Sequence, residues 1–202
     1  MACNLTAAIG IDCKDQIGGL KYVYFTDYYY QNIENVATIT SNSFDLTDAG
    51  MPNWELESGT APGAVTVYRY ALRPDLSSMT VNVNASKANG TTFYEQTLSL
   101  TLQKITSATA YQLRLLAYSR PQVFVQDNNN NLMLLGMNNG MDVSGGTVVS
   151  GVAKGDMSGF TIDISGEELA PFISLPTPVI GSTDYPFSLP ASDTAVLSVT
   201  EA

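Results

Sequence analysis

The sequence predicts a mainly β protein, a β-sandwich or barrel with one short flanking α-helix at about 107–119. Two observations carry this prediction. Residues 92–104 alternate between apolar and polar side chains, which is typical of a strand with one buried face. The period then becomes helical, and two apolar runs follow at 122–127 and 132–137 around an Asn-rich turn, which is a hairpin pattern.

The predicted strand at 92–104 has two different faces. Leu98 and Leu100 share one parity with Gln96, whereas Glu95 and Thr97 take the other. Because successive side chains of a strand point to opposite sides, Glu95 is expected to face away from Leu98 and Leu100.

The predicted helix at 107–119 has both of its ends marked in the sequence. Thr106 or Ser107 can cap its start, and Pro121 ends it, because the residue before a proline is pushed out of the helical region. Its expected buried stripe, at helical spacing, is formed by Ala108, Tyr111, Leu115 and Tyr118.

The rest of the chain reads as further strands and two segments of different character. Residues 41–63 have no clear period, and their apolar side chains indicate a loop that docks onto another surface. After residue 168 the repeated prolines disfavour helix and central strands, so a domain at 1–168 is expected to precede an extended Pro-rich arm at 169–202. The other strands are expected at 20–25, 33–40, 64–72, 79–83, 143–153, 160–165 and 195–200.

The composition of the chain disfavours several classes of function. The chain has 202 residues, 9 basic and 19 acidic, with a net charge of −10 and the basic residues scattered singly. This balance argues against a protein that grips DNA or an anionic membrane, and it leaves open DNA passing nearby without being held. With 0 histidines, the commonest general base and transition-metal ligand is missing. No secretory signal or membrane-spanning run is recognisable, so folding in a cytoplasm is expected.

The few motif-like stretches have simple structural interpretations. Residues 127–131 (DNNNN) resemble the start of a calcium loop, but Leu132 and Asn138 stand where Gly and Glu are needed, so a polar hairpin tip is expected. The glycines of 145–151 lack phosphate-loop spacing and indicate a flexible or bulged strand. Glu167 and Glu168 are interpreted as a solvated pair. Cys3 and Cys13 are either two buried thiols or a disulfide.

Three segments carry a resemblance to a known family. Residues 18–25 read GGLKYVYF, residues 93–100 read FYEQTLSL before the helix, and residues 120–127 read RPQVFVQD before the Asn-rich turn. Together they resemble structural proteins of tailed phages and prophages of the Bacteroidetes group, and within that set the tail tube protein. The resemblance spans roughly residues 18–165 and leaves the arm after residue 168 uncovered.

The resemblance implies a virion structural protein that is not an enzyme and has no cofactor or metal. It implies a β-sandwich of the tail-tube type at 1–168, with hexameric rings that stack into a tube through which DNA passes without specific binding. Its implied partners are further copies, a tape measure protein and a tail terminator, with no membrane. Its implied location is the virion tail, after assembly in the bacterial host cytoplasm.

Within that picture, two sets of residues are candidates for function. The loop at 41–63 is expected to contact the next ring, and Glu95 is expected to face the lumen. Two alternatives stay open: another phage structural protein (a head–tail connector, tail completion or capsid-decorating protein) and a surface carbohydrate-binding β-sandwich. The tyrosines at 28–30 and Trp54 fit core packing, subunit contacts or ligand binding. The expected ring-stacking residues are Phe44, Met51, Trp54 and Leu56.

Overall fold

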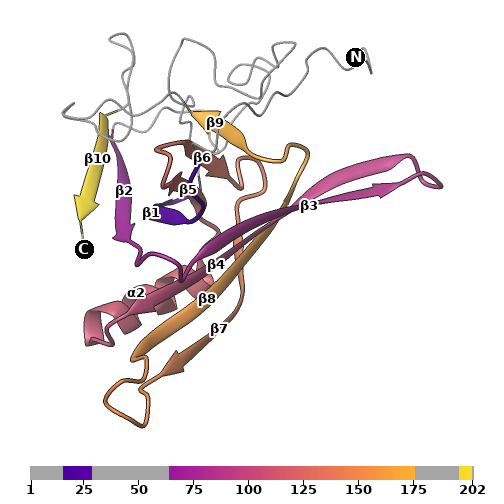
Figure 1. Ribbon diagram of the computed structural model, residues 1–202. Coiled ribbons are helices and arrows are strands. Elements are labelled where there is room, and N and C mark those ends of the chain that lie inside the picture. The colour runs from indigo at the N-terminus through magenta and orange to yellow at the C-terminus, as the bar shows by residue number, and fades with distance from the viewer. Residues whose placement is uncertain (1–15, 29–63, 176–195, 202) are drawn as a thin grey trace.

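The computed structural model describes residues 16–28, 64–175 and 196–201. These residues form two β-sheets packed as a sandwich, with one short helix beside them (Figure 1). The mainly β fold expected from the sequence is confirmed. The strand expected at 33–40, the loop at 41–63 and both cysteines lie outside the described residues.

The first sheet has six strands in the order β10-β2-β1-β5-β6-β9. β10 runs parallel to β2, and all other neighbours are antiparallel. The segment after residue 168 therefore supplies both edge strands of this sheet. The strands are β1 (Leu20–Thr26), β2 (Ala64–Ala71), β5 (Gln122–Asp127), β6 (Leu132–Leu135), β9 (Ile173–Leu175) and β10 (Val196–Glu201).

The second sheet has four antiparallel strands in the order β3-β4-β8-β7. β3 and β8 are longer than the sequence predicted. β7 contains an irregularity between Val143 and Gly145, which is the bulge that its glycines indicated. The strands are β3 (Ser78–Ser86), β4 (Thr91–Gln103), β7 (Asp142–Val149) and β8 (Gly159–Glu168).

The hairpin of β3 and β4 projects beyond the rest of the molecule (Figure 1). β8 pairs with β4 only from Tyr94 onward, whereas the hairpin ladder continues to the pair of Ser86 and Thr91. Gly90 closes the turn with a positive φ of 63°, a conformation that glycine adopts without strain. The far end of this hairpin therefore has two strands where the body of the sheet has four.

The hydrophobic core lies between the two sheets. β4 and β8 contribute alternate residues from the four-stranded sheet, and β1 and β5 contribute theirs from the six-stranded sheet. Burial of these apolar side chains is the main stabilising contribution expected for a sandwich of this size. The core residues are Leu20, Val23, Phe25, Leu98, Leu100, Val123, Val125, Leu135, Met141, Phe160, Ile162 and Ile164.

Helix α2 (Ser107–Tyr118) has the ends that the sequence predicted, but it presents a different face to the sandwich. Thr106 caps it in a reciprocal capping box with Thr109. The expected buried stripe is wrong, because Tyr111, Leu115 and Tyr118 are 58%, 46% and 83% exposed. Leu113 and Leu116 pack against the core instead.

The failure of the stripe has a physical reason. Thr109, Leu113 and Leu116 also follow helical spacing, and the packing of Leu113 and Leu116 against the core selects this second row. No α2 residue is fully buried, so the row with Leu113 and the expected row with Tyr111 differ only moderately in how much surface they bury. At 12 residues α2 is short, and none of the helices in the described ranges is long and apolar enough to cross a bilayer.

Candidate functional site: the polar face of the four-stranded sheet

The outer face of the four-stranded sheet is set by the alternation of β4. Leu98 and Leu100 are fully buried in the core, and Glu95, Thr97 and Ser99 point to the opposite side. The expectation that Glu95 faces away from the leucines is therefore confirmed.

The neighbouring strands extend the same face, because paired residues of adjacent strands point to the same side. Thr161, Asp163 and Ser165 of β8 lie beside the polar residues of β4, and Thr147 of β7 lies beside Thr161. β3 completes the face with alternate hydroxyl and amide residues, which are Ser78, Thr80, Asn82 and Asn84.

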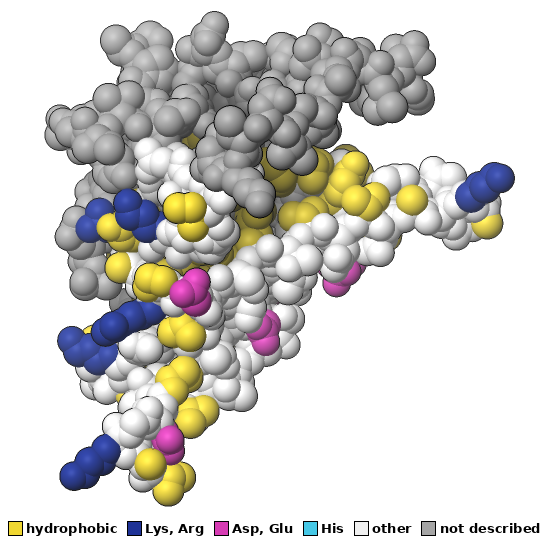
Figure 2. Space-filling model, viewed as in Figure 1, with side chains coloured by type: hydrophobic (Ala, Val, Ile, Leu, Met, Phe, Trp, Pro, Cys, Tyr) yellow, Lys and Arg dark blue, Asp and Glu magenta, His cyan; other side chains and the backbone are white. Residues whose placement is uncertain are grey.

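The charged side chains that the four strands place on this face are all acidic. None of the four strands contains a lysine or an arginine. In the space-filling view, acidic side chains are spaced over the sheet, whereas basic ones lie at the hairpin tips and on the left of the molecule (Figure 2). The carboxylates of the face are Glu95, Asp142, Asp163 and Glu167.

Hydrogen bonds connect the polar side chains of neighbouring strands. The Ser99 hydroxyl donates to Asp163 over 2.7 Å, and the hydroxyls of Thr147 and Thr161 are 2.7 Å apart. The Asn84 amide donates to the Glu95 carboxylate over 3.4 Å. Cross-strand pairs of this kind hold side chains close to the sheet, so the face is a polar surface without large projections.

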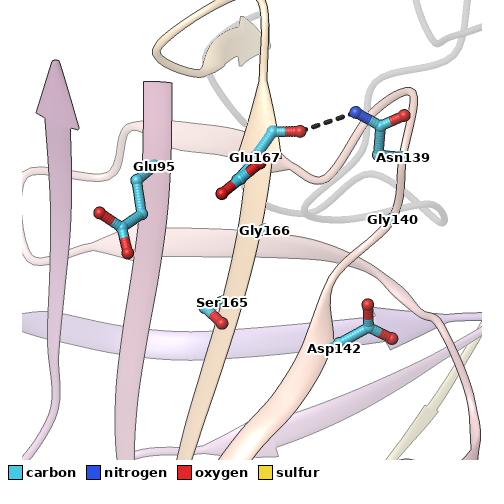
Figure 3. Close-up of a pocket in the computed structure, with 7 residues that line it drawn as sticks. All are labelled: Glu95, Asn139, Gly140, Asp142, Ser165, Gly166 and Glu167. Carbon is cyan, nitrogen blue, oxygen red and sulfur yellow. Dashed lines mark hydrogen bonds between the residues drawn. The ribbon is translucent and has the colours of Figure 1, made fainter. Parts of the chain in front are cut away.

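A hollow of about 390 Å³ opens on this face where β7 begins (Figure 3). Glu95 and Glu167 come to it from adjacent strands, and Asp142 lies on the β7 side. The Asn139 amide bounds it and donates to the backbone oxygen of Glu167 over 2.7 Å. Within the described residues, no group of three or more His, Cys, Asp or Glu side chains is placed to hold a metal ion.

Two buried polar side chains behind this face connect it to the rest of the molecule, and each has only a weak signal in the sequence. Gln96 is 2% exposed, and its amide donates to the backbone oxygens of Ala170 and Pro171 over 3.2 and 2.9 Å. Its oxygen accepts the N–H of Gly136, which directly follows β6 of the other sheet, over 2.9 Å. The signal was a polar residue on the apolar parity of a strand.

Glu168 is the second connection, and its interpretation as solvated is wrong. It is 4% exposed, and its carboxylate accepts the backbone N–H groups of Asn138 and Asn139, both over 2.8 Å. The Asn138 amide donates to its second oxygen over 3.0 Å. Its neighbour Glu167 is exposed, as expected. Glu168 thus fixes the turn that carries the chain from β6 to β7.

That turn also requires glycine and an aromatic neighbour. Gly140 has a φ of 70°, and a Cβ there would lie 2.6 Å from Cγ of Arg120. The Arg120 guanidinium stacks 3.9 Å from the ring centre of Tyr28, whose hydroxyl donates to the backbone oxygen of Asn138. Tyr28 therefore packs within its own chain.

Two titrating groups outside the polar face have shifted pKa values. Burial raises the pKa of Tyr70, and nearby Tyr68 adds to the effect. At the β7–β8 loop, the backbone N–H groups of Ala153 and Val152 hydrogen-bond to Asp156 and lower the pKa of its carboxyl group. The polar hairpin tip at 127–131 is held in a similar way, with the Asn131 N–H donating to Asp127 over 2.7 Å.

The expected ring-stacking residues, Phe44, Met51, Trp54 and Leu56, lie outside the described residues. The structure therefore places one of the named candidates, Glu95, and surrounds it with carboxylates that sequence reasoning did not group. The signal for that grouping was the absence of basic residues from four strands that are far apart in the sequence.

Comparison with known proteins yields a distant structural likeness. No protein-family model and no curated protein matches the sequence. Among solved structures, a chain of the "Virion of native gene transfer agent (GTA) particle" is similar to part of this fold. The match has a TM-score of 0.32 and 4% identity, and it covers 50% of this chain and 84% of that chain.

Proposed function

We propose that this chain is the tail tube subunit of a phage or phage-like particle. In this proposal, the four-stranded sheets of six copies join edge to edge into one closed barrel, and rings of six stack into a tube. The polar face becomes the inner wall, and Glu95 faces the lumen. The subunit would be assembled in the bacterial host cytoplasm and would reside in the virion tail.

The observation that carries the proposal is the combination of a one-signed polar face with two free sheet edges. In the described part of the chain, β3 pairs with β4 alone and β7 with β8 alone. Exposed sheet edges invite pairing with another chain, and closure into a barrel removes them. A wall with more carboxylates than cations carries a net negative charge and repels phosphate, so DNA can pass without adhering.

Two further parts of the proposal come from the sequence. The loop at 41–63, with Phe44, Met51, Trp54 and Leu56, is proposed to contact the next ring, because its apolar residues have no periodic place in a strand or helix. The proposed partners are a tape measure protein and a tail terminator, both by the resemblance to tail tube proteins.

Negative-stain electron microscopy of the purified full-length protein tests the proposal. Long tubes with six-fold end-on views and a central channel are the expected result. Single rings that never stack would support a head–tail connector or tail completion protein instead. Monomers that persist at high concentration, with tape measure and terminator proteins added, would contradict a self-assembling subunit.

Charge reversal at Glu95 tests the assignment of the inner wall. Glu95→Lys places six cations on each ring, so DNA that does not bind wild-type tubes at physiological salt is expected to bind the variant tubes. Lys154→Glu, at the β7–β8 loop, is the control and should leave DNA binding undetectable. Variant tubes that assemble normally and still bind no DNA would show that Glu95 does not line the channel.

A further inference from the structure

The two edge strands of the four-stranded sheet have similar lengths and run in opposite directions, so they can pair with each other between copies. β3 has 9 residues and β7 has 8. Because the four strands alternate in direction, β3 and β7 run opposite ways. Rotation about a ring axis does not change whether a strand points up or down that axis. In a ring, β3 of one copy therefore lies antiparallel to β7 of the next. The junction then continues the pattern of the sheet itself.

The two edges also match in the side chains that they leave exposed. Val83 of β3 and Val148 of β7 are 62% and 61% exposed. Val83 pairs with Tyr94 and Val148 with Phe160, so both valines lie on the core side of the sheet. Each edge therefore carries an uncovered valine on the same side, and joining the edges extends one apolar face across the boundary.

The alternation of side chains restricts how the edges can meet. A shift of one residue would turn every side chain of β3 to the wrong side, so only every second register is allowed. Thr80 and Thr147 both face the polar side, through their pairs with Thr97 and Thr161. Met79 and Val148 both face the core side.

We infer that β3 of one copy pairs with β7 of the next copy in the register that sets Thr80 opposite Thr147, which rests on the ring assembly proposed above. Ser78 then lies opposite Val149 at one end, and Asn84 lies opposite Asp142 at the other. The extra residue in the β7 bulge, between Val143 and Gly145, is absorbed between these points. Val83 meets Val143, which covers its exposed surface.

Charge complementarity supports this register. In it the β3–β4 turn passes the start of β7 and lies beside Asn139 and Gly140 of the next copy. Lys87 is in that turn, and the space-filling view shows a basic side chain at the hairpin tip (Figure 2). The hollow at this position contains the carboxylates of Glu95, Asp142 and Glu167 (Figure 3). Lys87 of one copy thus neutralises part of the acidic hollow of its neighbour.

Disulfide trapping in assembled full-length protein tests the register. In a Cys3→Ser/Cys13→Ser background, Thr80→Cys/Thr147→Cys should give a ladder of oxidised oligomers up to the ring size on a non-reducing gel. Directly opposite side chains lie about 5 Å apart across a strand pair. Within one copy the two positions are three strand spacings apart across the sheet, roughly 14 Å, and are offset along it as well, so an internal disulfide cannot form.

A matched pair of variants separates the inferred register from its neighbour. Asn82→Cys/Thr147→Cys is offset by two residues and should trap at least fivefold less oligomer. Rings that form by microscopy but trap through this second pair would overturn the register. Rings that trap through neither pair would also overturn the register and leave the proposed function standing, because the edges can join in another allowed register, whereas monomers alone would overturn both.

A charge exchange tests the contact of Lys87. Lys87→Glu should raise the protein concentration needed for assembly by about tenfold, and Lys87→Glu/Glu167→Lys should restore it to within about threefold. Lys154→Glu, the same change in the other hairpin loop of this sheet, should have no effect. Assembly that is equally sensitive to both single changes, or a double variant without rescue, would contradict the contact.

Discussion

In the six-stranded sheet the central strands are buried on both faces, whereas in the four-stranded sheet burial alternates along the strands. Every residue of β6 is buried, and so are Gln122 and Gln126 of β5. In β4, by contrast, Gln96, Leu98 and Leu100 are buried and the residues between them are only partly covered. One sheet is enclosed, and the other presents a face to its surroundings.

The two sheets differ in the role of their polar groups: some are buried and stabilise the fold, and others form an exposed surface. In the six-stranded sheet, buried amides have internal partners: Gln122 donates to the Met137 oxygen over 2.8 Å, and the Tyr24 hydroxyl donates to Gln126 over 3.1 Å. On the polar face of the other sheet, polar side chains hydrogen-bond to each other across exposed strands. Stability should therefore depend strongly on buried polar groups with internal partners, which include Gln96 and Glu168 on the inner side of the four-stranded sheet, and weakly on the groups of the polar face.

Gln96→Leu should have the largest effect on stability. It leaves the Gly136 N–H and the Ala170 and Pro171 oxygens without this partner in a buried region, and each unsatisfied group costs about 1–3 kcal/mol. We expect the free energy of unfolding in urea to fall by about 2–4 kcal/mol. Gln103→Leu, an exposed glutamine at the end of the same strand, should change it by less than about 0.5 kcal/mol. Equal effects would contradict the role of Gln96.

Glu168→Gln should have the next largest effect. The variant keeps one oxygen for the N–H groups of Asn138 and Asn139 but loses the second, charged acceptor. Hydrogen bonds to charged groups contribute about 1.5–3 kcal/mol, so a loss of about 1–2 kcal/mol in urea unfolding is expected. The matched control is Glu167→Gln, because Glu167 is adjacent and exposed. A control that loses as much as Glu168→Gln would show that the turn is held by other contacts.

The alternation of β4 and the ends of α2 were predictable because each depends on neighbours in the sequence. Strand parity fixed the side of Glu95, and Thr106 and Pro121 bounded the helix. The buried face of α2 was not predictable, because Leu113 and Leu116 compete with an equally regular row and contacts with distant strands decide between them. Glu168 was missed for the same reason: its partners are about thirty residues away and lie in another element.

The candidate site was predictable only in part. The side of Glu95 followed from β4 alone, but Asp142, Asp163 and Glu167 join it through strand pairings between separate parts of the chain. The number and order of strands in the sheet set this grouping, and neither can be read from the periodicity of one segment.

Raising the pH should lower the stability of the protein by a smaller amount through Tyr70, which lies at the edge of the core. Tyr70 packs edge-on against Phe25, with ring centres 5.3 Å apart, and burial raises its pKa above the ordinary 10.0. A raised folded-state pKa contributes stability that is present below pH 10 and is lost as the pH rises through the folded value. Tyr70→Phe should therefore lose less stability than wild type between pH 9 and pH 11, measured by urea unfolding. Tyr118→Phe, at an exposed tyrosine, should follow the wild-type curve.

Asp163→Asn on the polar face should have the smallest effect. The Ser99 hydroxyl donates to Oδ1 of Asp163, and asparagine keeps an oxygen in that position. Removing one of four like charges on the face also relieves some repulsion, so the free energy of unfolding should stay within about 0.5 kcal/mol of wild type. A sharper test is the salt dependence of the free energy of unfolding in wild type and variant. If carboxylates on this face repel each other, wild type should gain more stability than the variant between low and physiological salt, because screening acts on exposed charges. A variant that unfolds far more easily than wild type at every salt concentration would show that this face stabilises the fold as strongly as the enclosed sheet does, and the contrast between the two sheets would then be wrong.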